Sequence, residues 1–153
     1  MKLEELTLRE RHEFAVMVTL ACVRRLEALT RRSDPEDVAV HRLLDNLAKK
    51  ALDRAMELES FRLRVLSRGP SRLSRKFAEE LIRLHFPSFS RPLGEGPLDR
   101  EGATYLAECL EEECANFYQS LAEGLEEGDS HTLFQSLGRQ DLSFLAFVRH
   151  VLL

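Results

Sequence analysis

The chain has 153 residues, enough for one domain with a sizeable buried core. Its content of 44% hydrophobic and 31% charged residues is typical of a soluble globular protein. The formal net charge of −4 gives the chain as a whole no attraction to nucleic acid or anionic lipid. Gly and Pro are few, and the long stretches without them favour helix.

A first hairpin of two long helices is predicted for residues 7–67, with a break after Arg32. Beyond the break, Asp34 is expected to be the N-cap of the second helix and Pro35 its first helical residue. The second helix should end at about Ser67, because a Gly-Pro pair follows and Pro cannot continue a helix.

A short helix and a long crossover are predicted for residues 71–98. Ser71 or Ser74 can cap the short helix, which should continue to His85 with an apolar face on one side. The segment after it is rich in Pro, Gly and Ser and is expected to cross over to the second half of the chain.

A second hairpin is predicted for residues 99–153. Asp99 is expected to cap its first helix, which should continue to about Glu127, and the polar residues 128–130 separate it from the last helix. Two helical hairpins joined by a long connection make one all-α domain with the layout of an up-down four-helix bundle.

Residues 14–29 of the first helix carry apolar side chains in every direction around the axis. A helix that is apolar on every side must be covered on every side. Four helices leave each one with an outer face, so we expect a second copy of the chain to cover this helix in a homodimer.

Nothing in the sequence indicates a membrane-spanning or secreted protein. The apolar run at residues 14–23 is too short to cross a bilayer, and the charged residues before it are unlike a cleavable signal. The three cysteines, Cys22, Cys109 and Cys114, show no metal-ligand spacing. Their odd number favours reduced thiols in a cytoplasmic protein.

The second hairpin carries the most specific pattern in the chain. Glu111 and Tyr118 lie in an acidic helix, and the last helix contains the segment Asp141-Leu-Ser-Phe144. With its Glu-x6-Tyr spacing, the acidic helix resembles the carboxylate helix of rubrerythrin-like ferritin domains, over roughly residues 104–153. The resemblance implies a ferritin-like bundle, from a family whose domains bind two irons and handle peroxide, oxygen or iron storage.

Most ligands of that family are missing from this chain. Asp141 and Phe144 occupy the places of the family's Glu-x-x-His, and an alignment of the two halves puts Ala51 and Arg54 where the other Glu and His would be. A di-iron centre of this type uses about four carboxylates and two histidines. At most Glu111 and Asp141 remain, and a cation at position 54 would oppose metal binding.

Helical-wheel geometry separates the candidate ligands. Asp141 projects near the centre of the apolar face of the last helix, where a lone carboxylate needs a partner. Glu111 and Glu113 lie on opposite borders of the apolar face of the preceding helix, so either could bind metal with Asp141, supported from behind by Tyr118. Without metal, Asp141 would accept a buried hydrogen bond from Tyr118 or an Arg and fix the helix register.

The other ionisable residues have simpler explanations. Glu59 and Arg62 share one face of the second helix and should form an ion pair. The histidines fall near predicted helix ends or loops, without ligand spacing, and are expected at the surface. They are His12, His41, His85, His131 and His150.

Three functions are consistent with these patterns. The leading hypothesis is a divergent ferritin-like protein with no intact di-iron site, no cofactor, and a structural or interaction role rather than an enzymatic one. The second is residual binding of iron or manganese by Glu111 and Asp141. The third is an adaptor for nucleic acid or protein that uses the basic segment 62–76. Its phosphate contacts would come from Arg72, Arg75 and Lys76.

Overall fold

The computed structural model describes residues 3–65 and 73–151, and over these ranges the protein is all-helical, as predicted. Within the same ranges, no helix is both long and apolar enough to cross a membrane. Short 3-10 turns, η1 and η2, occupy Leu3–Glu5 and Pro87–Phe89. The α-helices are α1 (Leu8–Arg32), α2 (Val38–Val65), α3 (Arg75–His85), α4 (Arg100–Ala122) and α5 (Asp129–Val151).

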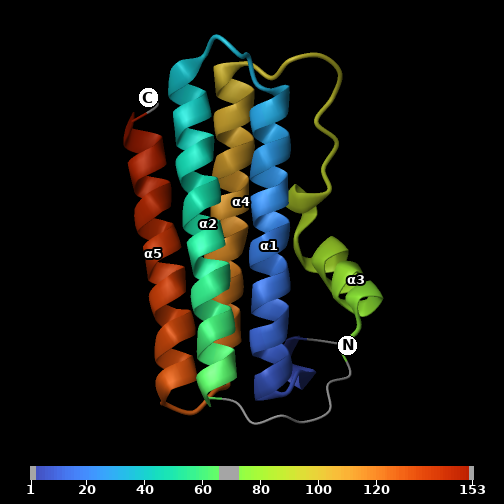
Figure 1. Ribbon diagram of the computed structural model, residues 1–153, viewed down its shortest axis with the longest axis vertical. Coiled ribbons are helices and arrows are strands. Elements are labelled where there is room, and N and C mark those ends of the chain that lie inside the picture. Colours follow the sequence, from blue (N-terminus) through green and yellow to red (C-terminus); the bar gives the residue numbers. More distant parts are fainter. Residues whose placement is uncertain (1–2, 66–72, 152–153) are drawn as a thin grey trace.

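The four long helices lie side by side along the long axis of the molecule (Figure 1). The helix α1 packs along α2, and α4 packs along α5, each pair being joined by a short turn. Contacts of α4 with α1 and α2 bring the two pairs together around one core. Fully buried side chains that form this core include Phe14, Leu26, Leu44, Leu58, Leu110 and Phe134.

Three helix starts follow from local capping. Thr7 accepts a hydrogen bond from the Glu10 N–H at 3.1 Å, and the Glu10 carboxylate accepts one from the Thr7 N–H at 3.0 Å. Ser74 and Asp99 each accept a bond from the backbone N–H three residues on. Each satisfies an N–H that would otherwise lack a helical partner. Ser71, the other predicted cap of α3, lies outside the described residues.

The predicted start of α2 is wrong. The helix begins at Val38, so Asp34 is not its N-cap and Pro35 precedes it. The Asp34 N–H instead donates to the carbonyl of Leu98 at 3.3 Å, which ties this turn to the crossover. Asp37 takes the capping role, because its carboxylate accepts a bond from the N–H three residues on at 3.3 Å.

The predicted end of α4 is also wrong, since the helix stops at Ala122 rather than near Glu127. Gly124 adopts a φ of +77°, a conformation that ends a helix and that other residues rarely adopt. The buried guanidinium of Arg11 on α1 donates to two carbonyl oxygens at this helix end, at 3.0 and 3.1 Å. The next helix, α5, starts directly at Asp129.

The outer side of α1 is covered in part by the chain itself. The short helix α3 and the turn η2 pack against it, and the crossover continues along the same side (Figure 1). The Arg32 guanidinium holds the crossover by donating to the carbonyls of Gly94 and Gly96 at 2.5 and 2.8 Å. A homodimer through residues 14–29 is predicted because the outer side of this helix must be covered, and these segments of the same chain cover part of it. The dimer stays a prediction.

His12 differs from the expected surface position. It is fully buried, with its ring stacked on Phe61 at 5.2 Å and packed against Phe134 at 4.7 Å. Its Nε2 lies 2.9 Å from the hydroxyl of Ser130. Burial, together with the charge of Arg62, lowers the pKa of His12 to about 4.

The close approach of α4 and α5 depends on Gly138. A Cβ at this position would lie 2.8 Å from the Gln119 Cγ and 3.2 Å from the Ala115 carbonyl oxygen.

We expect Gly138→Leu to lower the free energy of unfolding by about 1–3 kcal/mol in urea titrations, because the helices must separate. The matched control Ser143→Leu, on the exposed side of α5, should stay within about 0.5 kcal/mol of the parent. Equal losses for both variants would contradict this packing.

Candidate functional site

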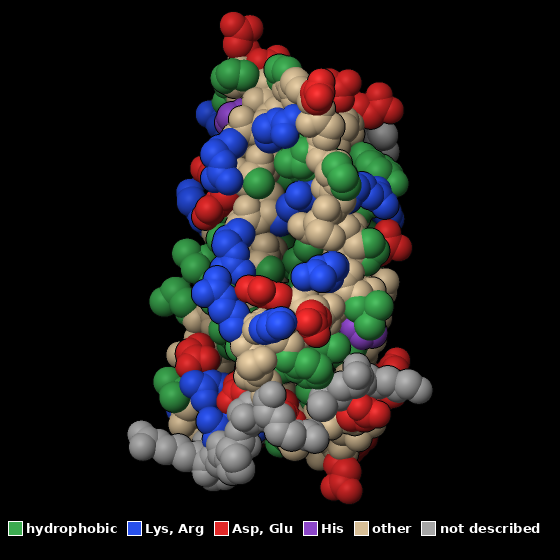
Figure 2. All heavy atoms as spheres, turned by 90° about the vertical axis from the view of Figure 1, so that its right-hand side faces the viewer, with side chains coloured by type: hydrophobic (Ala, Val, Ile, Leu, Met, Phe, Trp, Pro, Cys, Tyr) green, Lys and Arg blue, Asp and Glu red, His purple; other side chains and the backbone are tan. Residues whose placement is uncertain are grey.

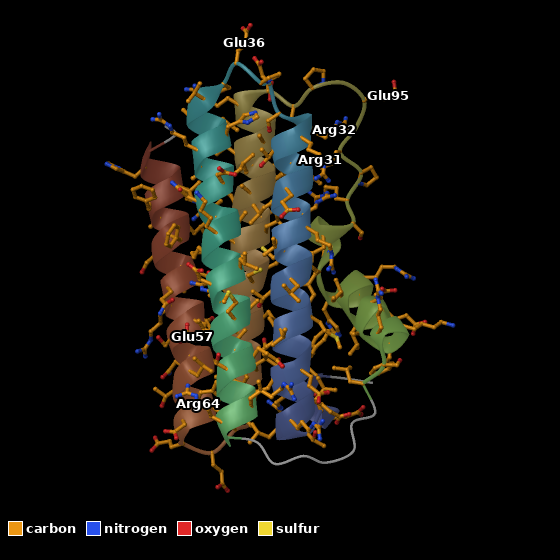
Figure 3. The ribbon with its side chains drawn as sticks, viewed as in Figure 1. Arg31, Arg32, Glu36, Glu57, Arg64 and Glu95 are labelled. Carbon is orange, nitrogen blue, oxygen red and sulfur yellow. The ribbon has the colours of Figure 1, made fainter. Side chains whose placement is uncertain are left out.

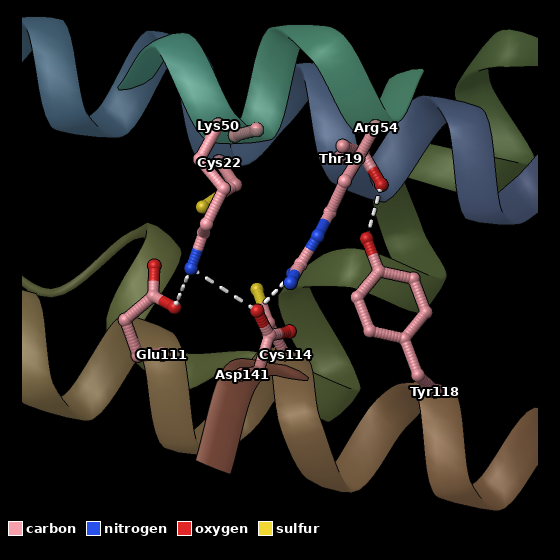
Figure 4. Close-up of a pocket in the computed structure, with 9 residues that line it drawn as sticks. Thr19, Cys22, Lys50, Arg54, Glu111, Cys114, Tyr118 and Asp141 are labelled. Carbon is pink, nitrogen blue, oxygen red and sulfur yellow. Dashed lines mark hydrogen bonds and ion pairs between the residues drawn. The ribbon is translucent and has the colours of Figure 1, made fainter. Parts of the chain in front are cut away.

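Four charged side chains meet in the interior between α2, α4 and α5 (Figure 4). Lys50 and Arg54 project from one face of α2, Glu111 comes from α4, and Asp141 comes from α5. Asp141 is completely buried, which confirms its predicted interior position. Glu111 and Arg54 are also buried, and the Lys50 side chain is 14% exposed. We call these four residues the ion-pair cluster.

Both carboxylates of the cluster are bound by cations. The Lys50 Nζ lies 2.6 Å from Glu111 Oε2 and 3.2 Å from Asp141 Oδ1. The Arg54 Nη1 also donates to Asp141 Oδ1, and its Nη2 donates to the Gln140 side chain at 3.3 Å. An arginine is therefore the partner of Asp141, one of the two arrangements expected in the absence of metal.

The two cations reach the carboxylates because they lie one helical turn apart on α2. Residues spaced i and i+4 face the same direction on a helix. The Lys50 ammonium also lies over the Phe144 ring, 4.0 Å from its centroid, and the Arg54 guanidinium lies 5.9 Å from the Tyr118 ring. These cation–π contacts stabilise the two positive charges at a position that is largely shielded from water.

Tyr118 does not contact Asp141 through its hydroxyl. That hydroxyl lies 2.5 Å from Thr19 Oγ1, and the Thr19 hydroxyl lies 2.7 Å from the Ala15 carbonyl. Because a carbonyl can only accept, the single Thr19 proton goes to Ala15 and Tyr118 donates to Thr19. Burial raises the pKa of Tyr118 well above its usual value, so the phenol keeps its proton.

Glu113, the alternative metal ligand, points to a different place. Both of its carboxylate oxygens lie 3.2 Å from the Ser88 backbone nitrogen in η2. It is not among the residues that line the cavity at the ion-pair cluster. The structure thus brings Glu111 to Asp141 and leaves Glu113 outside the cluster.

A cavity of about 10 Å³ lies against the ion-pair cluster, with Cys22 and Cys114 also in its wall. A space of this size admits one water molecule at most. Asp141 Oδ2 and Arg54 Nε are buried beside it, and neither has a hydrogen-bond partner within residues 3–65 and 73–151. The site can therefore hold polar contacts and a small solvent molecule, but not an organic substrate.

Burial controls the protonation of the cluster. Desolvation raises the pKa of Glu111 to about 7, and the attraction of Lys50 only partly offsets it. Burial lowers the pKa of Arg54, but the charge and hydrogen bond of Asp141 outweigh it, so the pKa rises overall. The guanidinium is therefore permanently charged, whereas Glu111 can change its charge near neutral pH.

The donor set does not fit a di-iron centre. Within the described part of the chain, no three His, Cys, Asp or Glu side chains come together in a way that could hold a metal ion. No histidine lines the cavity, and the inward carboxylate oxygens already bind an ammonium and a guanidinium. Two fixed cations at this distance oppose a divalent metal.

The basic segment 62–76 is only partly described. Arg72 lies outside the described residues, Lys76 is exposed, and Arg75 pairs with Glu79 at 3.1 Å on the surface. The expected pair at the start of the segment is confirmed, since Arg62 Nε donates to Glu59 at 3.0 Å. The phosphate-binding hypothesis stays a prediction.

Comparison of this chain with models of protein families, with curated proteins and with solved structures finds no match. Its interpretation therefore depends on its own residues. The sequence pattern indicated Asp141, Glu111 and Arg54 as residues of interest but not Lys50. The available signal was its position one turn before Arg54, which places both side chains on the same face of α2.

Removing Asp141 and Arg54 together should cost less than the sum of the costs of removing each alone. We expect Asp141→Leu and Arg54→Met each to lower the free energy of unfolding by about 3–5 kcal/mol. The first leaves the Arg54 guanidinium without a carboxylate, and the second leaves Asp141 and Glu111 to share the single charge of Lys50. The double variant should lose at least about 1 kcal/mol less than the sum of the single losses. Urea denaturation followed by circular dichroism measures all three. Strict additivity would mean that the two side chains are not coupled.

The pKa of Glu111 predicts a pH dependence of stability. An unfolded glutamate has a pKa of about 4.3, so between this value and about 7 the folded protein binds more protons and its stability falls as pH rises. The unfolding free energy of the parent minus that of Glu111→Gln should decrease by up to about 3 kcal/mol from pH 4.5 to 8. The lowered pKa of His12 makes stability rise with pH between about 4 and 6.5, because the unfolded state binds more protons there. His12 is present in both proteins, so its effect cancels in the difference. A pH-independent difference would contradict this.

Proposed function

We propose that the chain is a ferritin-like up-down four-helix bundle with a structural or interaction role, in which the ion-pair cluster takes the place of the metal centre. One observation carries the proposal. The cationic groups of Lys50 and Arg54 lie on Glu111 and Asp141, the two residues to which the family resemblance assigns ligand roles.

The electrostatic balance of the site supports this replacement. Carboxylates inside a helical bundle are costly to desolvate unless positive charge compensates them. In the family that this chain resembles, iron supplies the positive charge. Here two basic side chains face two carboxylates, so the cluster is balanced without an ion. Arg54 stands where the alignment of the two halves would put a histidine ligand.

The size of the cavity favours a structural role over a catalytic one. A space of about 10 Å³ cannot admit peroxide together with a metal, or any larger substrate. The competing hypothesis, residual binding of iron or manganese by Glu111 and Asp141, requires both cations to leave carboxylates that they bind in the interior. Their withdrawal would place unpaired charge in a dry environment.

Metal content tests the proposal. Purified protein incubated with Fe(II) under anaerobic conditions, or with Mn(II), and then desalted should retain less than about a tenth of an equivalent per chain by elemental analysis. Retention of one or more equivalents would overturn the proposal in favour of the residual metal site.

A rebuilt variant provides the matched control. Ala51→Glu with Arg54→His creates a Glu-x-x-His on α2, Phe144→His adds a second histidine, and Lys50→Leu removes the remaining cation. If the correspondence with the family is right, the combined variant, with three carboxylates and two histidines at the site, should retain about one metal ion per chain. A variant that keeps its helical circular dichroism but binds no metal would show that the ferritin-like correspondence is wrong.

A further inference from the structure

A groove of about 370 Å³ lies between α1 and the segment formed by α3 and η2, on the side of α1 away from the ion-pair cluster. Arginines from both helices line it, and Lys and Arg side chains gather on this face of the molecule (Figure 2). The apolar side chains in its wall are Ala21, Ala28, Ile82 and Phe89.

Two arginines of this groove, Arg24 and Arg83, form no ion pair within the described part of the chain. Among the described residues, no carboxylate lies within ion-pair distance of Arg24 or Arg83, and both are exposed. Glu79 lines the groove too, but it pairs with Arg75 outside it at 3.1 Å. The whole chain has more acidic than basic residues, so carboxylates are not scarce overall. The absence of ion pairs for these two arginines is therefore specific to the groove.

Arg25 is the most constrained of the groove arginines. Its Nη2 donates to the backbone carbonyl of Arg91, and its Nε is buried with no hydrogen-bond partner among the residues that the structure describes. Burial and the nearby charge of Arg91 lower the pKa of Arg25. The charge of Arg91 is offset only in part by the Glu113 carboxylate, so the two guanidinium groups repel each other, and a bound anion would relieve that repulsion.

The positive side of α1 continues beyond the groove. Arg31 and Arg32 lie further along the helix, on the side of the crossover (Figure 3). Arg32 is held by the carbonyls of Gly94 and Gly96, whereas Arg31 is exposed. An anion approaching this face therefore meets positive charge before it reaches the groove.

We propose that this groove binds a small amphiphilic anion, an apolar body that carries a phosphate, sulfonate or carboxylate group. Guanidinium groups form paired hydrogen bonds with such oxyanions. The alanines leave room over the α1 surface for the apolar body, between Ile82 and Phe89. The volume is within the range of about 300–1,000 Å³ that is usual for small-ligand sites. This binding role goes beyond the proposed structural role and does not depend on it.

Fluorescence titration of the full chain with 1-anilinonaphthalene-8-sulfonate, an aromatic sulfonate, tests the proposal. We expect saturable binding that is about tenfold weaker in the double variant Arg24→Ala with Arg83→Ala, since two charge-assisted hydrogen bonds are lost. Ala28→Leu, which fills the groove without changing charge, should also weaken binding. The matched control Arg139→Ala, an exposed arginine in a separate surface groove beside Lys50, should leave it unchanged.

Competition distinguishes the sources of the anionic group. Dodecyl phosphate or dodecanoate should displace the dye, whereas inorganic phosphate at the same concentration should not, because it lacks the apolar body. Displacement by a single-stranded oligonucleotide at lower phosphate concentration would overturn the proposal in favour of a polyanion surface. Absence of saturable binding, or equal weakening by Arg139→Ala, would also overturn it. Far-UV circular dichroism of each variant shows that the helices are intact.

Discussion

A carboxylate at the centre of the apolar face of α5 imposes the strongest constraint on this fold. Asp141 is fully removed from solvent, so the protein must supply positive charge at a fixed point in its interior. That charge comes from α2, in the other helical pair, through Lys50 and Arg54. A shift of α2 by one helical turn, about 5.4 Å, would bring one cation into the place of the other and move the second away from the carboxylates, so the two-to-two match of charges would be lost. The cluster thus specifies how the two pairs align.

Other buried polar contacts act between the same two halves. The Arg11 guanidinium of α1 binds carbonyls at the end of α4, and Tyr118 of α4 donates to Thr19 of α1. The largest helix packing is within each pair, between α1 and α2 and between α4 and α5. The buried hydrogen bonds and ion pairs therefore lie between the two helical pairs, where apolar packing is less extensive than within each pair. Such bonds discriminate between alignments that apolar side chains alone tolerate.

The helices were predictable because their signals are local, whereas each error combines a missed local signal, Asp37 or Gly124, with a long-range contact. Caps such as Ser74 and Asp99 act within one turn, and the period of apolar residues placed Asp141 inside. The backbone of Asp34, before the start of α2, donates to Leu98, and the end of α4 is bound by Arg11 from the opposite end of the chain. No local pattern contains these partners.

The candidate site was predictable only to the level of single helices. A helical wheel gave Glu111 and Glu113 equivalent border positions, and only their neighbours, Lys50 for one and Ser88 for the other, distinguish them. Lysine in a polar stretch of sequence indicates a solvated surface, so Lys50 was missed. Its long apolar stem lets the ammonium reach inward over Phe144 while the side chain stays partly exposed.

Stability alone does not account for the ion-pair cluster. Apolar residues of similar volume at the four positions would often be neutral or stabilising, since buried ion pairs barely recover their desolvation cost. The unpartnered Asp141 Oδ2 and Arg54 Nε show that the hydrogen bonding within the cluster is incomplete. Specific alignment of α2 with α4 and α5 is the property that apolar replacements could not supply. A role in which this chain presents a defined surface, such as the arginine-lined side of α1, requires that alignment more than it requires added stability.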